Sequence, residues 1–284
     1  MRHLESESNL VHALLGQGVA LDPELLDKFR RRPDHLQRLS ERAAAQAPVV
    51  GRWITRHLIG AYPELAHGFD AYRTSPYVRC KESVGMVALH VPQFAQSARF
   101  KREMRLRERD RGIEGPLTPD EHRRQYPANA ARLEADSLMW IPPDGESIDH
   151  VATARVRSLL GMVRRQHEEE GAHSFFASTH GEVEMALMAA LFNWGPEEWS
   201  VESVKPENRV GNGALLHLST VNPALGRPDG DFHLRLANPL LDEGPGEWRT
   251  VSVPDYSPEQ LLQQAQRHER VFPPGMLTGL LPEL

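Results

Sequence analysis

The sequence predicts an α/β protein, a three-layer α/β/α sandwich around a mostly parallel, mixed central sheet. Short apolar runs with strand character, at 71–74, 104–109, 174–179, 214–220 and 231–237, alternate with stretches of helical periodicity. Hydrophobic residues make up 40% of the 284 residues and charged residues 25%, which is enough to build a sizeable core. These values exclude a chain that is disordered overall.

Helical periodicity is clearest over 36–57, 81–91, 181–193 and 258–270, and Ser147 is a suitable N-cap for a long helix. Pro48 is expected to kink the first of these helices or to start a second one. Residues 113–145 are rich in proline and predict an irregular excursion around one short helix near 120–136. We therefore expect a main domain at 1–240 that carries the 113–145 excursion, and an extension at 241–284 that docks on it.

Charge and cysteine content restrict the partners and the compartment. The formal net charge of −6 argues against broad nucleic-acid binding. The longest apolar stretches, such as 185–194, are too short to cross a bilayer, so no membrane partner is expected. Arg2-His3-Leu4-Glu5 stands where a signal peptide would be apolar, and the single Cys80 suits a reducing compartment. We expect a cytoplasmic protein, with a homo-oligomer left open.

Two clusters in the first third of the chain combine arginine with residues that react with or bind anions. The first, at 2–9, joins Arg2 to His3, which would place a neutral imidazole nucleophile beside a fixed cation. The second, at 75–79, is a turn that sets Arg79 near a helix N-terminus, where anions are favoured. A surface histidine and a solvated arginine are the alternative interpretations.

Two further clusters supply an acid and a second histidine. In the 106–112 segment, Glu108 is either a general acid or one member of a surface charge network. At 179–182, an apolar strand ends in His180 and a helix begins, so that His180 can donate to an oxyanion. A core or capping histidine is the alternative there. His167 and His173 lie six residues apart, which does not match the spacing of a zinc protease.

Taken together and in this order, the clusters resemble the histidine phosphatase superfamily, in its phosphoglycerate-mutase-like branch. The family's Arg-His-Gly-Glu-Ser-x-x-Asn pattern is matched at Arg2, His3, Glu5, Ser6 and Asn9. Its Ser-Pro-x-x-Arg motif is matched at 75–79 and its Leu-x-Glu-x-x-x-Gly segment at 106–112. Gly-Glu-Ser at 145–147 and Thr-His-Gly at 179–181 complete the resemblance, which covers about residues 1–220.

The resemblance implies a phosphomonoester hydrolase with a phosphohistidine intermediate on His3. Arg2, Arg79 and His180 would hold the phosphate oxygens, with Asn9 as a weaker contact, and Glu108 would act as general acid and base. Neither a metal nor another cofactor is implied, and the substrate is expected to be a phosphorylated small molecule. The alternatives are a phosphomutase and a phosphate-binding pseudoenzyme without turnover.

Three features of the sequence complicate this interpretation. Leu4 replaces the family's glycine and would be strained if that position required a positive φ; it would then also narrow the phosphate pocket. The apolar strand that normally precedes Arg-His is missing, so we expect either a numbered start inside a longer product or a short central strand. Burial or a nearby phosphate must raise the pKa of Glu108 against the lowering effect of Arg107 and Arg109.

Overall fold

The computed structural model describes residues 1–115, 117–253, 255–267, 271 and 276. It divides the chain into two compact units, 1–251 and 252–284. The helices of the first unit are α1 Glu7–Gly16, α2 Pro23–Arg31, α3 Ala43–Ile54, α4 Val78–Ala88, α5 Pro92–Ser97, α6 Pro119–Gln125, α7 Pro127–Ala135, α8 Ile148–His150, α9 Arg157–Glu170, α10 Gly181–Phe192 and α11 Pro196–Glu202. The second unit contains α12 Pro258–Gln266.

Shorter helical turns and six strands complete the described part. The 3-10 turns are η1 Asp34–Leu36, η3 Pro63–Leu65, η4 Met104–Leu106, η5 Gly112–Glu114 and η7 Pro206–Asn208, and the π-helical turns are η2 Thr55–Ile59 and η6 Val151–Val156. The strands are β1 Ala71–Thr74, β2 Phe100–Arg102, β3 Phe175–Ser178, β4 Leu215–Asn222, β5 Arg227–Ala237 and β6 Arg249–Thr250.

The strands form two three-stranded sheets. In the parallel sheet β2-β1-β3, Tyr72 of β1 is in register with Phe100 on one side and Phe176 on the other. In the antiparallel sheet β4-β5-β6, β4 and β5 form a long hairpin. The α/β class with a parallel sheet is thus confirmed. The sequence predicted a single, mostly parallel sheet. The structure has two sheets instead, because β4, β5 and β6 pair with one another in antiparallel fashion.

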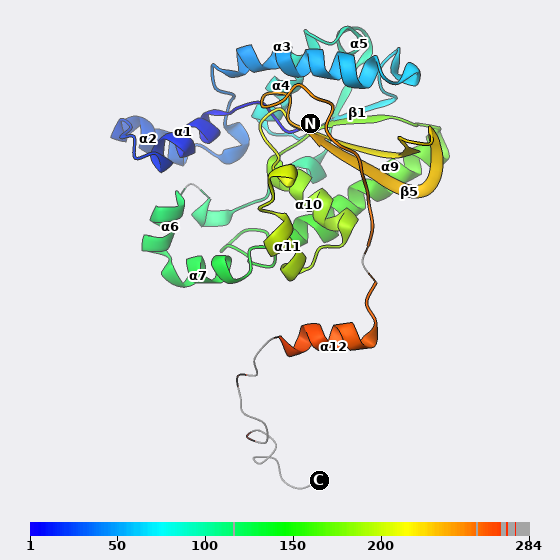
Figure 1. Cartoon of the computed structure of the whole chain (residues 1–284). Helices are drawn as coiled ribbons and strands as arrows, with labels where there is room; N and C mark the ends of the chain where they lie inside the picture. The colour runs from blue at the N-terminus through cyan, green and yellow to red at the C-terminus, as the bar shows by residue number, and fades with distance from the viewer. Residues whose placement is uncertain (116, 254, 268–270, 272–275, 277–284) are drawn as a thin grey trace. The chain divides into compact units, whose positions relative to one another are not determined.

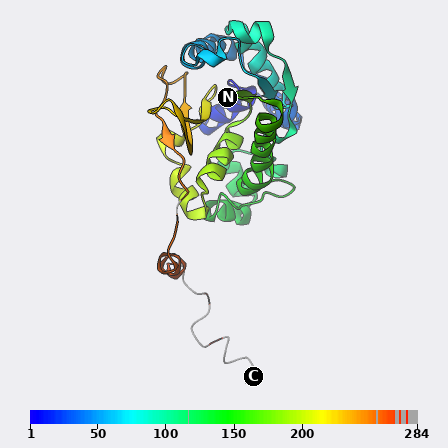
Figure 2. The ribbon, with the colours of Figure 1, turned by 90° about the vertical axis from the view of Figure 1, so that its right-hand side faces the viewer.

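Residues 1–3 connect the two sheets. The His3 amide donates to the Thr179 carbonyl at 3.0 Å, directly beyond β3, and the Arg2 amide donates to the Ala214 carbonyl at 2.9 Å, directly before β4. Arg2 and Thr179 form a parallel bridge. Figures 1 and 2 both place the N-terminus beside the strands inside the first unit. The short segment that carries Arg2 and His3 therefore lies at the ends of strands from both sheets.

Two separate apolar clusters support this arrangement. One contains Leu4, Val50 and Trp53 together with side chains of β1 and β3. The other lies among η6, α10 and α11 and includes Val151 and Ala186. In Figure 1, α3 lies on one side of the strands and α10 and α11 on the other. The strand ends that carry the predicted site are thereby fixed between two packed regions.

Several predicted elements differ in detail. The strand expected at 104–109 is a 3-10 turn, and the pairing strand next to β1 is β2 at 100–102. The excursion contains two short helices, α6 and α7, because Pro119 and Pro127 each occupy the first turn of a helix, where proline is tolerated. Helix α3 continues through Pro48 without ending.

Other predictions are confirmed, and the boundary after the main domain shifts. Ser147 caps the predicted long helix, which consists of α8, η6 and α9 in direct succession. Its Oγ accepts from the His150 amide at 2.9 Å. The first unit extends past 240 to Val251, because β6 pairs with β5. Docking of the C-terminal extension stays a prediction, and its residues 268–270, 272–275 and 277–284 lie outside the described part. Within the described residues, no helix has the length and apolarity required to cross a membrane.

Candidate active site

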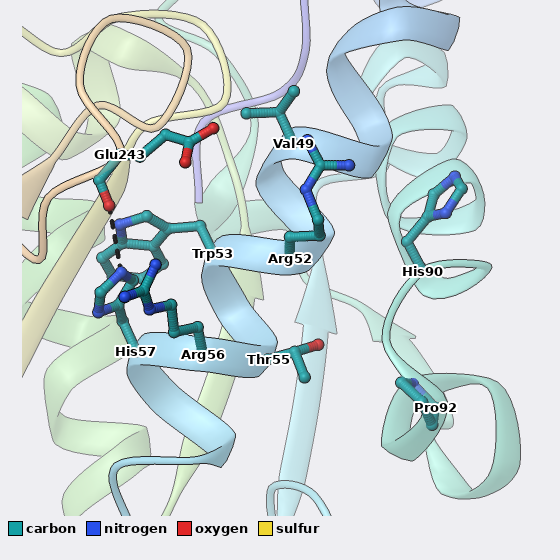
Figure 3. Close-up of a pocket in the computed structure, with 9 residues that line it drawn as sticks. All are labelled: Val49, Arg52, Trp53, Thr55, Arg56, His57, His90, Pro92 and Glu243. Atoms are coloured by element: carbon teal, nitrogen blue, oxygen red, sulfur yellow. Dashed lines mark hydrogen bonds between the residues drawn. The ribbon is translucent and has the colours of Figure 1, made fainter.

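Two cavities stand out in the described part of the chain. The smaller one, of about 490 Å³, lies along α3 and is lined by Arg52, Trp53, His57 and Glu243 among others (Figure 3). The larger one, of about 1150 Å³, is lined by Arg2, His3, Asn9, Arg79 and Glu108. His180 lies directly beneath this second set, in contact with Glu108 and with its ring centroid 5.2 Å from that of His3. All six predicted site residues therefore gather around the larger cavity.

His3 is held as a neutral imidazole whose Nε2 carries the lone pair. Its ring is buried, and Nδ1 lies 2.6 Å from the carbonyl oxygen of Leu4. Because a carbonyl only accepts hydrogen bonds, the proton is on Nδ1 and the lone pair is on Nε2. Burial, and then the positive charges of Arg79 and Arg2, hold the pKa of His3 well below its usual range. This tautomer suits a nucleophile at Nε2.

Leu4 fits without the strain expected from the sequence. Among the described residues other than glycine, only Asp144 and Asn193 have a positive φ. The Leu4 amide donates to Ser83 Oγ at 2.9 Å, and the side chain is fully buried in the apolar cluster below α3. Leu4 is not among the residues that line the larger cavity. The expected strain and the expected narrowing of the phosphate pocket were both wrong.

Arg79 lies in the first turn of α4, directly after β1, with only 4% of its side chain exposed. Its Nε donates to His3 Nε2 at 3.2 Å, and its two terminal nitrogens donate to the Asp34 carboxylate at 3.0 and 3.1 Å. Burial works to lower the pKa of Arg79, but Asp34 and Glu108 outweigh it and raise that pKa. The guanidinium is thus a permanent cation next to the imidazole.

Glu108 follows η4 and approaches both Arg79 and His180. One of its carboxylate oxygens lies 3.8 Å from Arg79 and 3.4 Å from His180 Nδ1. Burial, and then repulsion from Glu182, raise the pKa of Glu108 to about 7, although Arg79 opposes the shift. A carboxyl group with this pKa can both give and take a proton near neutral pH.

The two arginines that flank Glu108 in the sequence point to other carboxylates. Arg107 donates to Glu146 at 2.6 Å, and Arg109 Nε lies 3.3 Å from Glu182. Their charges are therefore compensated locally, which explains why they do not hold the pKa of Glu108 low. These two ion pairs explain how the pKa of Glu108 can be raised although Arg107 and Arg109 are its neighbours in the sequence.

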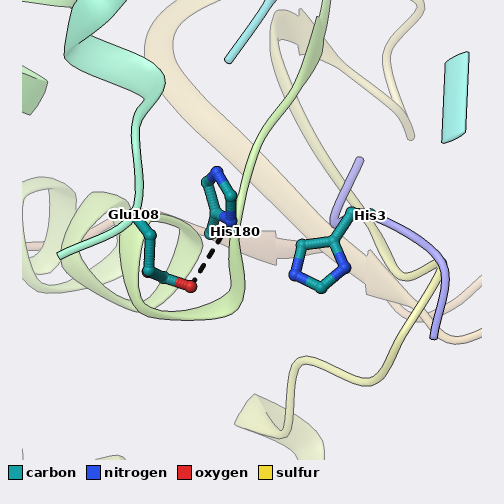
Figure 4. Close-up of side chains that lie close together, drawn as sticks. All are labelled: His3, Glu108 and His180. Atoms are coloured by element: carbon teal, nitrogen blue, oxygen red, sulfur yellow. Dashed lines mark ion pairs between the residues drawn. The ribbon is translucent and has the colours of Figure 1, made fainter. Parts of the chain in front are cut away.

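His180 is the N-cap residue of α10 and is fully buried. Its Nε2 lies 2.8 Å from Ser75 Oγ, whereas its Nδ1 has no hydrogen-bond partner among the described residues and faces Glu108. Burial, followed by the charge of Arg79, keeps the pKa of His180 well below its usual range. A neutral ring with one unsatisfied nitrogen is directed toward the cluster (Figure 4).

Arg2 extends beneath the start of α10. One terminal nitrogen donates to the Val210 carbonyl at 2.5 Å, while its Nε has no hydrogen-bond partner among the described residues. A Cβ atom at Gly181 would lie 3.2 Å from that Nε. The glycine of the His-Gly pair therefore leaves the space that the Arg2 side chain uses.

Asn9 contributes mainly to helix capping. Its Oδ1 accepts from the Ser6 hydroxyl at 2.9 Å and from Asn212 Nδ2 at 2.9 Å, and its amide donates to Ser6 Oγ at 3.2 Å. The last of these contacts and the reciprocal bond from the Ser6 amide to Asn9 Oδ1, at 3.2 Å, form the capping box of α1. Asn9 lines the cavity, and its role as a phosphate contact stays a prediction.

Comparison with known proteins places this geometry in a family. A family model described as histidine phosphatase superfamily (branch 1) matches residues 37–208. The chain belongs to the histidine phosphatase superfamily. That match includes Arg79, Glu108 and His180, whereas Arg2 and His3 precede it and join the site through the geometry just described. No curated protein matches the sequence.

Several solved structures share the histidine phosphatase fold with this chain. The alpha-ribazole phosphatase from Shigella flexneri has a TM-score of 0.52 at 17% identity, covering 81% of this chain and 92% of its own. A protein named mycobacterial hydrolase 2 has a TM-score of 0.51 at 19% identity, covering 95% and 96%. Mycobacterial glucosyl-3-phosphoglycerate phosphatase with inorganic phosphate has a TM-score of 0.50 at 18% identity, covering 89% and 93%.

The donor set of this histidine phosphatase also requires a test against a metal ion. One ligand atom each from His3, Glu108 and His180 lie within 4.8 Å of one another, and two imidazoles with a carboxylate can bind a divalent cation. However, Arg79 already donates a hydrogen bond to the lone pair that His3 would use. The fixed charges of Arg2 and Arg79 oppose a cation and favour an anion at this position.

Among the cavity residues that were not predicted as site residues, four contact the predicted ones or their partners: Asp34, Tyr77, Arg109 and Glu182. Tyr77 lies 5.0 Å from the His180 ring between centroids, and burial raises its pKa to about 12. Three of the four are adjacent to a recognised motif residue, which is a signal that could have found them. Asp34 is in none of the motifs, and only the structure brings it to Arg79.

Proposed function

We propose that this histidine phosphatase hydrolyses phosphomonoesters through a phosphohistidine on His3, on the family's three-layer α/β/α sandwich. The observation that carries the proposal is the state of His3. Its Nδ1 is fixed on a backbone carbonyl, its Nε2 keeps a lone pair, and the Arg79 guanidinium lies against that lone pair. An imidazole arranged in this way is ready to attack a phosphorus atom that the arginines bring close.

In the first step, His3 Nε2 attacks phosphorus in line with the ester oxygen. The N–P bond forms while the P–O bond to the leaving alcohol breaks, and Glu108 transfers its proton to that oxygen. Arg2, Arg79 and His180 stabilise the remaining phosphate oxygens. His180 Nε2 lies 2.8 Å from Ser75 Oγ; with the Ser75 hydroxyl as the donor in this contact, His180 Nδ1 carries the proton and donates to the phosphoryl group. Phosphoryl transfer depends mainly on positioning and on charge stabilisation, which these groups supply without a metal.

In the second step, the Glu108 carboxylate accepts a proton from a water molecule, and the resulting hydroxide attacks the phosphohistidine. The N–P bond breaks, the lone pair returns to His3, and inorganic phosphate leaves. A pKa of about 7 lets Glu108 serve as the acid of the first step and the base of the second.

The charges around the cavity support a phosphorylated substrate. Nine arginines and six carboxylates line it, although the whole chain carries a net charge of −6. The positive charge is thus concentrated where a phosphate would enter. A phosphatase acting on alpha-ribazole phosphate and one acting on glucosyl-3-phosphoglycerate, both named as such, share the fold. We propose a phosphorylated small molecule as substrate.

The test is a burst experiment with p-nitrophenyl phosphate, comparing the wild type with His3→Ala. We expect nitrophenol release in the wild type and a loss of at least about a thousandfold in the variant, since the nucleophile is absent. The matched control is His35→Ala, which removes a cavity histidine away from the nucleophile and should keep most of the activity. Equal background rates in all three proteins would contradict the proposal and favour a binding protein without turnover.

The same experiment separates hydrolysis from transfer. With ³²P-labelled substrate, the wild type should release inorganic phosphate, and label trapped on the protein should be lost in His3→Ala. Slow release to water together with fast transfer to an added sugar phosphate would identify a phosphomutase instead. A screen of phosphorylated metabolites by phosphate release then identifies the substrate class.

A further inference from the structure

Every nitrogen of the Arg79 guanidinium donates to the protein itself. Nε donates to His3, and one terminal nitrogen donates to Asp34 twice, to its carbonyl oxygen at 2.8 Å and to its carboxylate at 3.0 Å. The other terminal nitrogen donates to the second carboxylate oxygen of Asp34 at 3.1 Å. The bidentate Asp34 carboxylate therefore occupies the guanidinium nitrogens that would otherwise bind two phosphate oxygens.

The two partners differ strongly in their exposure to water. The Arg79 side chain is 4% exposed, whereas the Asp34 side chain is 54% exposed. Among the described residues, the Asp34 carboxylate receives hydrogen bonds from Arg79 alone. Asp34 lies in the three-residue turn η1 after Pro33, while Arg79 is fixed by α4 and by His3. The Asp34 side chain can turn into water once another anion compensates Arg79, and Arg79 cannot follow it.

A buried guanidinium without a counterion is destabilising, because its charge has lost its hydration without gaining a partner. Asp34 supplies the counterion as long as no phosphate is bound. A phosphate dianion brings two negative charges to the same guanidinium. It can replace the single charge of Asp34 with a net gain in electrostatic attraction. A singly charged group of similar shape gains no such advantage, because it exchanges one charge for an equal one.

We propose that Asp34 is an internal ligand of Arg79 that the substrate's phosphate displaces, so that only an anion that binds Arg79 more strongly than Asp34 does can occupy the site. The inference rests on the proposed function, since it takes Arg79 as a phosphate-binding residue. It deepens that function by selecting a class of substrate. Dianionic phosphomonoesters displace Asp34, whereas phosphodiesters and carboxylates compete with it poorly.

The test is calorimetric titration with inorganic phosphate at about pH 8, where the dianion predominates. We expect Asp34→Asn to bind phosphate about three- to tenfold more tightly than the wild type, because the competing charge is removed. Titration with the monoanion dimethyl phosphate should show weaker binding to each protein and a gain of similar size, because displacing Asp34 costs the same free energy for either ligand. Asp34→Ala, which also removes the acceptor oxygens, should likewise bind phosphate more tightly than the wild type.

The matched control is Glu134→Gln, which removes a carboxylate that lines the same cavity and pairs with Arg123 at 3.6 Å. It should change phosphate affinity by less than about twofold. An equal gain in this control, or an unchanged or weaker affinity in both Asp34 variants, overturns the inference. So does a wild type that binds no phosphate. Because the readout is binding without turnover, an inactive wild type that shows the Asp34 effect would contradict the proposed function alone.

Discussion

The two cavities of this protein contain similar residues in different surroundings. The smaller cavity has Arg52, Arg56, His57 and His90, so it is also rich in arginine and histidine (Figure 3). There, both arginines and His90 are exposed to water. In the larger cavity, His3, His180 and Arg79 are buried and in contact with one another and with Glu108 (Figure 4).

The difference shows that burial and pairing, and not composition, distinguish a reactive site in this fold. Exposed charges are screened by water and keep their ordinary chemistry. In the larger cavity, burial first and then the action of nearby charges at short range neutralise His3 and His180 and raise the pKa of Glu108 to about 7. The contrast leads to four substitutions. Three change Glu108, the carboxylate that holds its loop and the carboxylate that raises its pKa, and the fourth changes an arginine of the smaller cavity.

The largest effect is expected from Glu108→Gln, which removes the proposed acid and base. We expect kcat to fall by about a hundred- to ten-thousandfold with an alkyl phosphate, whose leaving oxygen needs a proton. The first step with p-nitrophenyl phosphate should suffer much less, because nitrophenolate leaves without protonation. Stopped-flow measurement of both substrates checks this. Glu243→Gln in the smaller cavity is the control, and an equal loss there would remove the distinction between the cavities.

The next effect concerns the support of Glu108. The Glu146 carboxylate accepts from Arg107 at 2.6 Å, from Arg155 at 2.9 Å and from the Asp110 amide at 3.1 Å. Glu146→Gln leaves two arginines without their counterion, so we expect a loss of about 2–4 kcal/mol in the free energy of unfolding. Urea denaturation measures it.

The control for that substitution is Glu168→Gln, which breaks the exposed pair with Arg164 on α9. It should leave the unfolding midpoint almost unchanged, since such pairs contribute little. Glu146→Gln should also lower kcat, because the loop that carries Glu108 loses its attachment. Unchanged stability and unchanged kcat would show that Glu146 does not position this loop.

A smaller effect is expected in the pH dependence. Glu108 must be protonated to act as an acid, and its pKa is raised, so kcat/KM should fall as the pH rises through about 7. Glu182→Gln removes a negative charge that raises this pKa and leaves Arg109 and Arg111 without their shared carboxylate. The fall should therefore begin at a lower pH. Rate profiles from about pH 5 to 9 with an alkyl phosphate measure it.

Glu134→Gln is again the control, because it removes a charge from the same cavity without contacting the pairs around Glu108. A profile of Glu182→Gln that coincides with the wild type, or one that moves to higher pH, would contradict the assigned influence of Glu182. The experiment also tests whether the fall of kcat/KM with rising pH is due to Glu108, since Glu108→Gln should abolish that fall.

The sequence allowed much of this site to be predicted, because several motif residues are adjacent to a strand end or a helix start. His3, Arg79 and His180 lie at such junctions, and local patterns identify them. Contacts between distant segments could not be predicted in this way. The partners of Arg107 and Arg79 are Glu146 and Asp34, which lie 39 and 45 residues away from them.

The same limit explains the errors in the fold prediction. The strand at 100–102 has no alternating pattern, because Lys101 and Arg102 are both exposed and only its backbone pairing with β1 defines it. The helices α1 and α2 were not predicted, since none of their side chains is buried. Strain at Leu4 was expected only on the condition that this position needs a positive φ, and Leu4 is not among the described residues with a positive φ.

The smallest effect should come from the smaller cavity. Arg52→Gln removes an exposed charge from α3, and we expect less than about a twofold change in kcat/KM and less than about 0.5 kcal/mol in stability. Its importance is that arginines line both cavities, so the presence of arginine alone would predict a similar loss for Arg52 and for Arg79. Steady-state kinetics and phosphate titration of Arg52→Gln beside Arg79→Gln decide between the two views. A large loss at Arg52 would show that the exposed pocket takes part in phosphate recognition, and that burial is not the property that separates the cavities.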